Sequence, residues 1–453
     1  MNGFQSTIND LIADKRTSAI LSALPEGAEL YLVGGTVRDA LIGREIKDLD
    51  YTTNLEPQEL IEIFEKNSIP IYPTGLQHQT VTAKPVQDLE HIEITTFRSS
   101  GMNPEGGVVK GQSIEEDLSY RDFTINSLAI CCHTATLIDP NQGNADIRNK
   151  TLKAVKSASE RFTEDPLRIL RMVRIAAQLG FEIDIETKKA SSLHIQSLSS
   201  VSIERIREEF SKILCSPKAS WAVNELESIG ALKTFLPEVS RYVDFEQNKF
   251  HKADLFNHSL EVLDKVSPEL TIRLAALFHD VGKPDTLSTD ENGDRHFYKH
   301  ESVGAGMTEK ILKRLKYSNK IISDVKCLVY THMRPLSAGA PGIRRLMRDV
   351  EDLYPTWREL KYADAMSCKI NEQDMEQEFQ DFDAKVTEVL AGPSVSPLSS
   401  LEVNGKDLMH AGIPEGRIIG NILKALHEKV LDDPSLNSRE ALLKLALDIK
   451  EEL

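Results

Sequence analysis

The spacing of apolar and polar residues divides the chain into a mixed first part and a helical second part. Apolar residues recur at helical spacing across residues 1–25. The short apolar run 30–33 then ends in Gly34 and Gly35, which is typical of a strand followed by a turn. The same criteria predict helices at 37–41 and 55–66 and strands at 49–53, 80–83, 92–97 and 125–132. Residues 1–150 should therefore form a mixed α/β unit.

Strand signals stop after residue 150, and helical spacing dominates the rest of the chain. We expect helices at 165–179, 202–214, 221–229, 268–278, 304–315, 320–331 and 418–429. The polar segment 280–298 is expected to be a loop, and the Pro- and Ser-rich segment 391–400 a linker. The predicted fold class is α+β, with a mixed head followed by an all-helical body.

Charge and cysteine content narrow the classes of function. The 54 Lys and Arg residues and 70 Asp and Glu residues give a net charge of −16, so any RNA partner requires a local basic surface. Candidate basic clusters are Lys310, Lys313, Arg314 and Lys316; Arg344, Arg345 and Arg348; and Lys406 and Arg417. Five cysteines without a Cys-x-x-Cys pair predict reduced thiols. With no secretory signal and no apolar run of about 18–20 residues, we expect a cytoplasmic protein without a membrane partner.

Gly34 and Gly35 precede a pair of aspartates. Consecutive glycines allow close backbone approach and leave N–H groups free to face an anion, and Arg38 adds a charge that suits a phosphate. Asp48 and Asp50 are two residues apart on a predicted strand, so both carboxylates point to one face. Because Mg²⁺ is held by one or two carboxylates together with substrate phosphates, the sequence predicts that Asp48 and Asp50 are catalytic residues that bind Mg²⁺.

A second set of charged residues follows the predicted head. Asp165 and Arg168 are three residues apart, so on a helix they can share a face. An aspartate accepts a hydrogen bond from an exocyclic amine, and an arginine donates to a ring nitrogen or carbonyl oxygen. Cytosine and adenine each present an amine to an aspartate and a neighbouring ring nitrogen to an arginine, so such a pair would accept CTP and ATP while disfavouring GTP and UTP. Arg171 and Arg174 lie on the same segment and are expected to meet phosphates.

The order and spacing of these motifs resemble those of the class II tRNA nucleotidyltransferase and bacterial poly(A) polymerase family, whose head is of polymerase-β type. The likeness covers nearly the whole chain through Tyr120-Arg121-Asp122-Phe123-Thr124-Ile125-Asn126, Asp139-Pro140 with Gly143 and Asp146, Glu164-Asp165-Pro166-Leu167-Arg168, Asn404-Gly405-Lys406-Asp407-Leu408 and Asn437-Ser438-Arg439-Glu440. It implies nucleotide-binding roles for Gly34, Gly35, Arg38, Arg121, Asp122, Asn126, Asp165, Arg168, Arg171 and Arg174. Tyr120 departs from the family pattern, in which an arginine usually stands at this position.

A separate group of histidines and aspartates lies in the helical part. His279 and Asp280 follow an apolar segment, with His258 upstream and Asp364 downstream. Such a set can surround a divalent cation with nitrogen and oxygen ligands, and His300 and His332 can extend it to a second ion. The set resembles the HD phosphohydrolase family, whose core is His…His-Asp…Asp. The resemblance implies a divalent transition metal (Ni, Mn, Fe or Co) bound by His258, His279, Asp280 and Asp364, a phosphatase or cyclic phosphodiesterase activity, and a phosphate contact by Lys283.

Together the two resemblances imply a four-domain enzyme: a nucleotidyltransferase head (1–150), a helical neck with a base-reading helix (151–245), an HD domain (246–390) and a helical tRNA-binding tail (391–453). The implied function is template-independent addition of C, C and A to the 3′ end of tRNA from CTP and ATP, together with a phosphohydrolase activity.

Four alternatives stay open. Family members that add the final A usually carry a flexible basic loop at the position of segment 99–111. In this chain the segment is glycine-rich and contains one basic residue, so a CC-adding enzyme is one alternative. A poly(A) polymerase is disfavoured because segment 74–80 has no paired arginines. The remaining two are an HD phosphohydrolase with a nucleotide-sensing head and an RNA-binding scaffold.

Overall fold

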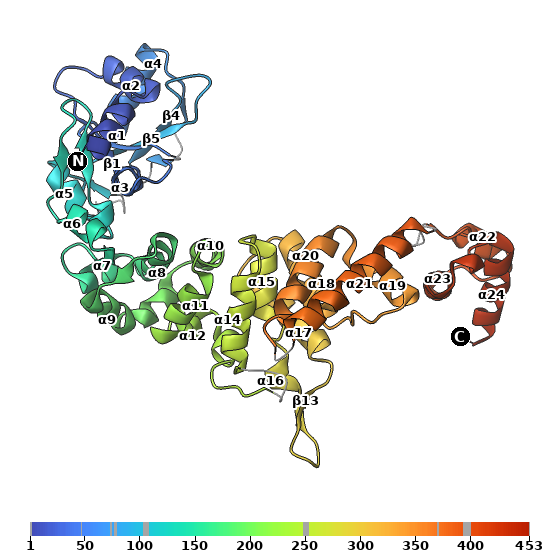
Figure 1. Ribbon diagram of the computed structural model, residues 1–453. Coiled ribbons are helices and arrows are strands. Elements are labelled where there is room, and N and C mark those ends of the chain that lie inside the picture. Colours follow the sequence, from blue (N-terminus) through green and yellow to red (C-terminus); the bar gives the residue numbers. More distant parts are fainter. Residues whose placement is uncertain are drawn as a thin grey trace. The chain divides into compact units, whose positions relative to one another are not determined.

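The computed structural model describes residues 2–46, 48–72, 75–76, 79–102, 108–247, 253–368, 371–392 and 400–452 (Figure 1). Its contacts divide the chain into two compact units. Unit 1 comprises Met1–Ile213 and Ser228–Thr234, and unit 2 comprises Leu214–Glu227 and Phe235–Leu453. None of the helices in the described ranges is long and apolar enough to cross a membrane.

The head in unit 1 is built on a seven-stranded sheet with the order β3-β4-β5-β2-β1-β8-β9. Its strands are β1 (Leu30–Val33), β2 (Asp50–Thr53), β3 (Ile71–Tyr72), β4 (Thr80–Ala83), β5 (Ile92–Thr96), β8 (Ala129–Cys131) and β9 (Leu137–Ile138). The β2–β5 pair is parallel with Asp50 opposite Glu93, whereas β1–β2 and β4–β5 are antiparallel. Leu32, Tyr51 and Ile94 are fully buried and anchor the centre of the sheet, so the start of β2 is held in a fixed place.

The other elements that begin in unit 1 are mostly short helices. They are α1 (Asn2–Ile12), α2 (Lys15–Ala23), α3 (Gly35–Ile42), α4 (Pro57–Lys66), α5 (Ile114–Ser119), α6 (Gly143–Arg148), α7 (Ala158–Glu164), α8 (Arg168–Leu179), α9 (Ile185–Leu193) and α10 (Ile203–Leu214), with 3₁₀ turns at Thr124–Asn126 and Ile195–Ser200. Two small sheets pair β6 (Arg98–Met102) with β7 (Val108–Lys110) and β10 (Thr151–Leu152) with β11 (Glu182–Ile183). The apolar stripe of α8 is buried, as its helical spacing predicts.

Unit 2 is a succession of helices with one hairpin. The elements from residue 219 onward are α11 (Ala219–Ser228), α12 (Leu232–Phe235), α13 (Pro237–Ser240), α14 (Leu255–Lys265), α15 (Leu270–Phe278), α16 (Lys283–Thr286), β12 (Leu287–Thr289), β13 (Arg295–Phe297), α17 (His300–Arg314), α18 (Asn319–Thr331), α19 (Ala340–Val350), α20 (Tyr354–Ala365), α21 (Glu372–Ala391), α22 (Gly405–His410), α23 (Arg417–Asp432) and α24 (Arg439–Glu452), with 3₁₀ turns at Glu351–Leu353 and Pro434–Leu436. Of these, α12 apart from Phe235 and the last residue of α11 belong to unit 1. Helix α15 is apolar on nearly every face, so it packs as a buried helix against α14, α18 and α20. This packing places the end of α15 deep inside the unit.

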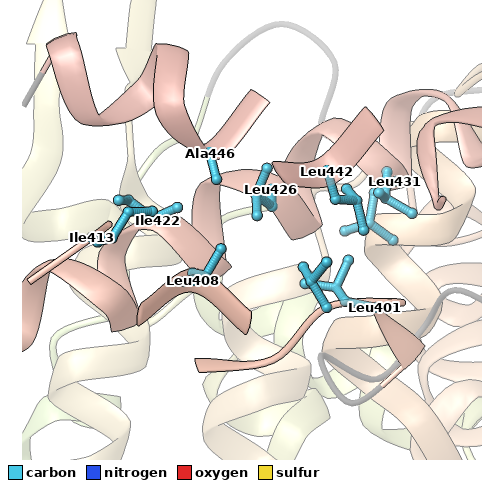
Figure 2. Packing of buried hydrophobic residues seen from close by; sticks show 10 residues of the cluster. Leu401, Leu408, Ile413, Ile422, Leu426, Leu431, Leu442 and Ala446 are labelled. Atoms are coloured by element: carbon cyan, nitrogen blue, oxygen red, sulfur yellow. The ribbon is translucent and has the colours of Figure 1, made fainter. Parts of the chain in front are cut away.

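The C-terminal helices have a hydrophobic cluster of their own. Figure 2 shows Leu408, Ile422, Leu426 and Leu442 from α22, α23 and α24 meeting in this cluster. A capping box at Asn404 begins α22, because the Asn404 Oδ1 accepts from two backbone N–H groups of the first turn. Residues 400–452 are therefore folded by apolar burial and not merely by helix propensity.

The structure confirms the mixed head and the mainly helical remainder, with three corrections. The strand expected at 125–132 is a 3₁₀ turn followed by the short β8, and strands recur after residue 150 as β10–β11 and β12–β13. The hairpin lies in the segment expected to be a loop; its strands are short with one apolar residue each, and the turn between them contains Asn292-Gly293, with Gly293 at φ +82°. Most of the expected linker, residues 393–399, lies outside the described residues.

Candidate active site of the head and candidate metal centre

The turn after β1 ties the two head aspartates to the start of α3. Thr36 Oγ1 donates to the carbonyl oxygen of Asp48 at 3.0 Å and accepts from the backbone N–H of Asp50 at 3.1 Å. Asp50 is the first residue of β2, and Asp48 lies just before it. Both aspartates line a cleft of about 490 Å³, so the structure brings together the pair that the sequence predicts.

A third carboxylate lies beside this pair. Glu93 on β5 is the register partner of Asp50 and lines the same cleft. Burial and the neighbouring Glu93 raise the pKa of Asp50, while the Arg121 guanidinium acts in the opposite direction. Oxygen ligands gathered in this way fit Mg²⁺. Sequence reasoning missed Glu93, although its polar position in the alternating run Ile92–Thr96 places it on the face opposite the core.

The glycine turn is kept narrow by Arg121. Gly34 has φ +66°, and a Cβ atom there would lie 3.0 Å from Arg121 Nη1, so both the backbone and the space favour glycine. Arg121 is held by Asp117, with Nη2 2.9 Å from Oδ2. Gly35 opens α3 directly after this turn. The predicted residues Gly34, Gly35 and Arg121 therefore meet at one place.

Arg38, Asn126 and Asp122 form a chain of hydrogen bonds. Arg38 Nη1 donates to Asn126 Oδ1 at 2.7 Å, and Asn126 Nδ2 donates to Asp122 Oδ1 at 3.0 Å. Arg171 Nη2 lies 2.7 Å from Asp122 Oδ2. Although burial opposes ionisation, the Arg171 guanidinium holds the pKa of Asp122 below its usual range. Four predicted residues thus form one buried, charged network that links the head to α8.

The expected pairing of Asp165 and Arg168 on one helix face is wrong for this structure. Pro166 favours an extended residue before it, and Asp165 has φ −144° and ψ 99°, so α8 begins only at Arg168. The Asp165 carboxylate accepts from Leu167 N–H and lies 2.9 Å from Arg205 Nη2. A base that binds Asp165 must therefore compete with Arg205.

Arg168 and Arg174 are also engaged within the protein. Arg168 Nη1 lies 2.8 Å from Glu164 Oε2, and its Nη2 donates to the Tyr120 carbonyl oxygen at 3.2 Å. Arg174 Nε lies 2.5 Å from Glu209 Oε2. In this structure the carboxylate partner of Arg174 is therefore Glu209, and the phosphate contact expected of Arg174 stays a prediction.

The candidate metal centre collects six side chains from five helices of unit 2 and the residues that follow them. His258 comes from α14, His279 and Asp280 follow α15, His300 begins α17, His332 follows α18, and Asp364 lies near the end of α20. They form two trios, His258–His279–Asp364 and Asp280–His300–His332, and the ligand atoms within each trio lie within 4.8 Å of one another. The structure thus assembles the four predicted core residues together with the two histidines expected to extend the set.

Asp280 stands between the two trios. Its Oδ2 lies 3.0 Å from His279 Nε2, and its Oδ1 lies 3.2 Å from His300 Nε2. Asp364 Oδ1 lies 3.2 Å from His258 Nε2. One carboxylate that faces both trios has the position of a ligand shared by two cations.

Backbone carbonyls orient three of the histidine rings. The Nδ1 atoms of His279, His300 and His332 lie 2.8, 2.7 and 2.7 Å from the carbonyl oxygens of residues 276, 297 and 329. This contact turns each Nε2 toward the cluster and fixes its tautomer, as in histidines that ligate metals. Burial lowers the pKa of His332, and neighbouring cationic groups hold the carboxyl pKa values of Asp280 and Asp364 well below the usual range despite burial. This donor set fits divalent transition metals.

A pocket of about 410 Å³ opens onto this cluster. Lys283 lines it, but Lys283 Nζ lies 2.6 Å from Asp280 Oδ2 and 2.7 Å from Gln247 Oε1. Lys283 therefore holds Asp280 in place in this structure, and its phosphate contact stays a prediction. Lys361 lines the same pocket.

The basic cluster Arg344, Arg345 and Arg348 is neutralised by α23. Arg344 Nε donates to the Leu431 carbonyl oxygen at 2.6 Å, and Arg345 lies 2.9 Å from Glu428 and 2.7 Å from Asp432. Arg348 also pairs with Glu428. Arg344 thus satisfies the last carbonyls of α23, whereas Arg345 and Arg348 pair with its carboxylates. A contact of this cluster with RNA stays a prediction.

Family models match most of the chain. A poly A polymerase head domain matches residues 30–153, a probable RNA and SrmB-binding site of polymerase A matches 180–243, and a tRNA nucleotidyltransferase domain 2 matches 302–446. The CC-adding tRNA nucleotidyltransferase of Thermus thermophilus is 31% identical over 417 residues, which cover 88% of this chain and 89% of that protein. The chain belongs to the tRNA nucleotidyltransferase family.

Other members of the family match over different lengths. The A-adding tRNA nucleotidyltransferase of Deinococcus radiodurans is 32% identical over an alignment that covers 70% of this chain and 75% of that protein. The CCA-adding enzyme of Listeria monocytogenes is 43% identical over 215 residues, 47% of this chain, so the chain spans about half the length of that relative (53%). The crystal structure of the Bacillus stearothermophilus CCA-adding enzyme in complex with CTP has a TM-score of 0.73 at 24% identity and covers 97% of this chain and 98% of its own. That match confirms the predicted head fold.

Proposed function

We propose that this tRNA nucleotidyltransferase adds C, C and A to the 3′ end of tRNA from CTP and ATP without a template. The observation that carries the proposal is the cleft in which Asp48, Asp50 and Glu93 gather beside the glycine turn and Arg121. Family membership supports the substrate class. We also propose the division into head, neck, HD domain and tail at residues 1–150, 151–245, 246–390 and 391–453, and action in the cytoplasm.

The residues of the cleft suit nucleotidyl transfer. The oxygen of the tRNA 3′-hydroxyl would bond to the α-phosphorus, the bond to the pyrophosphate oxygen would break, and the hydroxyl proton would pass to water. Asp48 and Asp50 would hold Mg²⁺, which supplies charge neutralisation and favours ionisation of the hydroxyl. The Gly34 N–H donates to the Leu128 carbonyl oxygen at 3.3 Å, so the Gly35 N–H and Arg121 are the donors of this turn that would face the triphosphate. Arg38 and Asn126 keep this side of the cleft in shape through Asp122.

Base choice is assigned to Asp165 and Arg168. Each is paired in this structure, with Arg205 and Glu164 respectively. Binding of a cytosine or adenine exchanges these contacts for hydrogen bonds to the base. A base without the matching amine leaves the charged groups without compensation, which is the basis of discrimination.

The range of nucleotides added is tested by supplying them one at a time. A tRNA transcript that lacks its last three nucleotides is incubated with Mg²⁺ and CTP, ATP, or both. We expect two additions with CTP alone, one addition with ATP on a transcript that already ends in CC, and none with GTP or UTP. The CC-adding alternative is favoured by the Thermus relative, which matches 88% of the chain, and it predicts no addition of A.

A second proposed activity is metal-dependent phosphoester hydrolysis in unit 2. His258, His279, Asp280 and Asp364 would hold a divalent transition metal, and Asp280, His300 and His332 a second. Water adds to phosphorus, the ester P–O bond breaks, and the products are phosphate and an alcohol; bound cations supply charge neutralisation on the phosphate. Element analysis of the purified protein, followed by phosphate-release assays with Ni²⁺, Mn²⁺, Fe²⁺ or Co²⁺, tests this activity. Protein that binds none of these metals contradicts it.

A further inference from the structure

The hairpin of unit 2 carries two stacked rings at the metal pocket. Strands β12 and β13 are antiparallel, and Figure 1 shows the hairpin projecting from the helices as a finger. His296 lies on β13 and Tyr298 directly follows it, and their ring centroids are 5.3 Å apart with an interplanar angle of 10°. Both residues line the pocket that contains Asp280, His300 and Asp364. The rings are thus part of the wall of the candidate metal centre.

The stack is fixed on one side and open on the other. His296 Nε2 lies 3.1 Å from Asp290 Oδ2 across the hairpin turn, which holds the imidazole ring in place. Between the two rings in sequence, Phe297 is buried and packs against Phe245 with centroids 6.0 Å apart. The Tyr298 side chain remains 71% exposed. Core packing accounts for an aromatic residue at position 297, but it does not account for an exposed aromatic ring at Tyr298.

The same pocket offers a cation and an apolar wall. Lys361 lines the pocket, where its charge helps to lower the pKa of Asp364, whereas Lys283 is engaged by Asp280 and Gln247. Met333 and Met375 also line the pocket, and Met333 is half exposed. A ligand that fits this wall carries an anionic group for the metal-ligand cluster and Lys361, and a flat apolar group for the rings and the methionines.

We propose that Tyr298 is a specificity-determining residue of this pocket, which stacks on the base of a nucleoside monophosphate whose phosphate lies at the metal cluster and Lys361. This inference rests on the proposed hydrolase function of unit 2. The stacked pair His296–Tyr298 provides a rigid platform, because Asp290 and the buried Phe297 hold the strand. Stacking accepts any base, so we expect discrimination between nucleotides and non-aromatic phosphoesters, not between bases.

Photolabelling locates the base directly and does not depend on turnover. The full-length protein is irradiated with 8-azidoadenosine 5′-monophosphate, and the labelled peptides are identified by mass spectrometry. We expect label on the peptide that contains Tyr298, competed by unlabelled AMP, with at least a fivefold loss in Tyr298→Ala and retention in Tyr298→Phe. Tyr330→Ala is the matched control, because Tyr330 is an exposed tyrosine of the same unit that does not line the pocket. Label confined to other peptides overturns the proposal.

Hydrolysis assays separate this proposal from the hydrolase function. With metal-loaded protein, the ratio of kcat/KM for AMP to that for glycerol 2-phosphate should fall about tenfold in Tyr298→Ala and stay unchanged in Tyr298→Phe. Labelling at Tyr298 without hydrolysis of either substrate supports the base platform and refutes the hydrolase. If both substrates are hydrolysed equally and Tyr298→Ala does not change either rate, the base platform is refuted and the hydrolase function is still supported.

Discussion

The two candidate sites of this chain are built in opposite ways. The head site places Asp48 and Asp50 within one short segment, and a single threonine hydroxyl at Thr36 sets the backbone of both. The metal centre instead draws six ligands from positions 258 to 364 on α14, α15, α17, α18 and α20. A local site can be encoded by a short sequence motif, whereas a distributed site forms only if five helices pack correctly.

The two sites also differ in how their charges are balanced. In the head, arginines form ion pairs with the buried carboxylates: Arg171 pairs with Asp122, and Arg121 pairs with Asp117. In the metal centre, Lys283 pairs with Asp280, the charge of Lys361 acts on Asp364, and the remaining close partners of the two carboxylates are histidines. Neutral histidines and carboxylates gathered in two buried trios are the donors that a bound cation would join, and such binding stabilises the folded unit. The difference predicts that unit 2 depends on metal for stability and that the head depends on it for activity.

The largest expected effect comes from the head carboxylates. Asp48→Ala removes a carboxylate ligand and Asp50→Asn removes the charge of one, each worth several kcal/mol of transition-state stabilisation, so nucleotide transfer should fall by about 10³-fold or more. Primer-extension rates measure it. Glu62→Ala, which removes an exposed carboxylate on α4, is the matched control and should retain wild-type rates. Transfer near the wild-type rate in either aspartate variant contradicts the assignment.

Removal of the metal centre should leave the head untouched. His279→Ala combined with Asp280→Ala takes away a ligand from each trio. We expect loss of bound transition metal and phosphoester hydrolysis, with unchanged nucleotide transfer. Chelation of the wild-type protein should likewise lower the unfolding temperature of unit 2, because the metal binds only the folded state. A folded double variant that loses nucleotide transfer would show that the two sites are not independent.

Base choice should change by a smaller amount. Asp165→Ala should weaken discrimination of CTP and ATP from UTP and GTP by about 1–3 kcal/mol, as expected for loss of paired base contacts. Arg205→Ala removes the partner that Asp165 has in this structure but leaves the carboxylate free for the base, so it should preserve discrimination. Competition assays with mixed nucleotides measure both variants. Equal loss of rate with intact discrimination in Asp165→Ala would refute base reading by this residue.

The smallest effect on RNA binding is expected at the basic cluster of α19. Because Arg344 and Arg345 are engaged with α23, the double variant Arg344→Glu/Arg345→Glu should change tRNA affinity by less than about twofold and should lower stability instead. Filter binding over a range of salt concentrations and thermal unfolding measure the two effects. A strong loss of affinity with a flatter salt dependence would instead show that these arginines contact phosphates.

The sequence predicts what is local and misses what depends on long-range packing. The pair Asp48–Asp50 and the adjacent His279–Asp280 are visible as motifs, and β1 and β4 are found at the predicted residues. Glu93 was missed because only the parallel pairing of β2 with β5 brings it to Asp50.

Other differences have equally physical causes. Asp165 leaves the helix because Pro166 follows it, and this local rule was available from the sequence. The pairing of Arg345 with Glu428 joins residues 83 positions apart, which no periodicity reveals. The platform at Tyr298 depends on a hairpin whose short strands resemble a loop.

The central claim is that the head cleft extends tRNA at its 3′ end. The most direct measurement is the intact mass of a tRNA transcript lacking its last three nucleotides, taken after incubation with CTP, ATP, Mg²⁺ and either the wild-type protein or Asp50→Asn. The account predicts a mass increase of two cytidylates and one adenylate with the wild-type protein and an unchanged mass with the variant. An unchanged mass with both proteins, or equal extension by both, would contradict it.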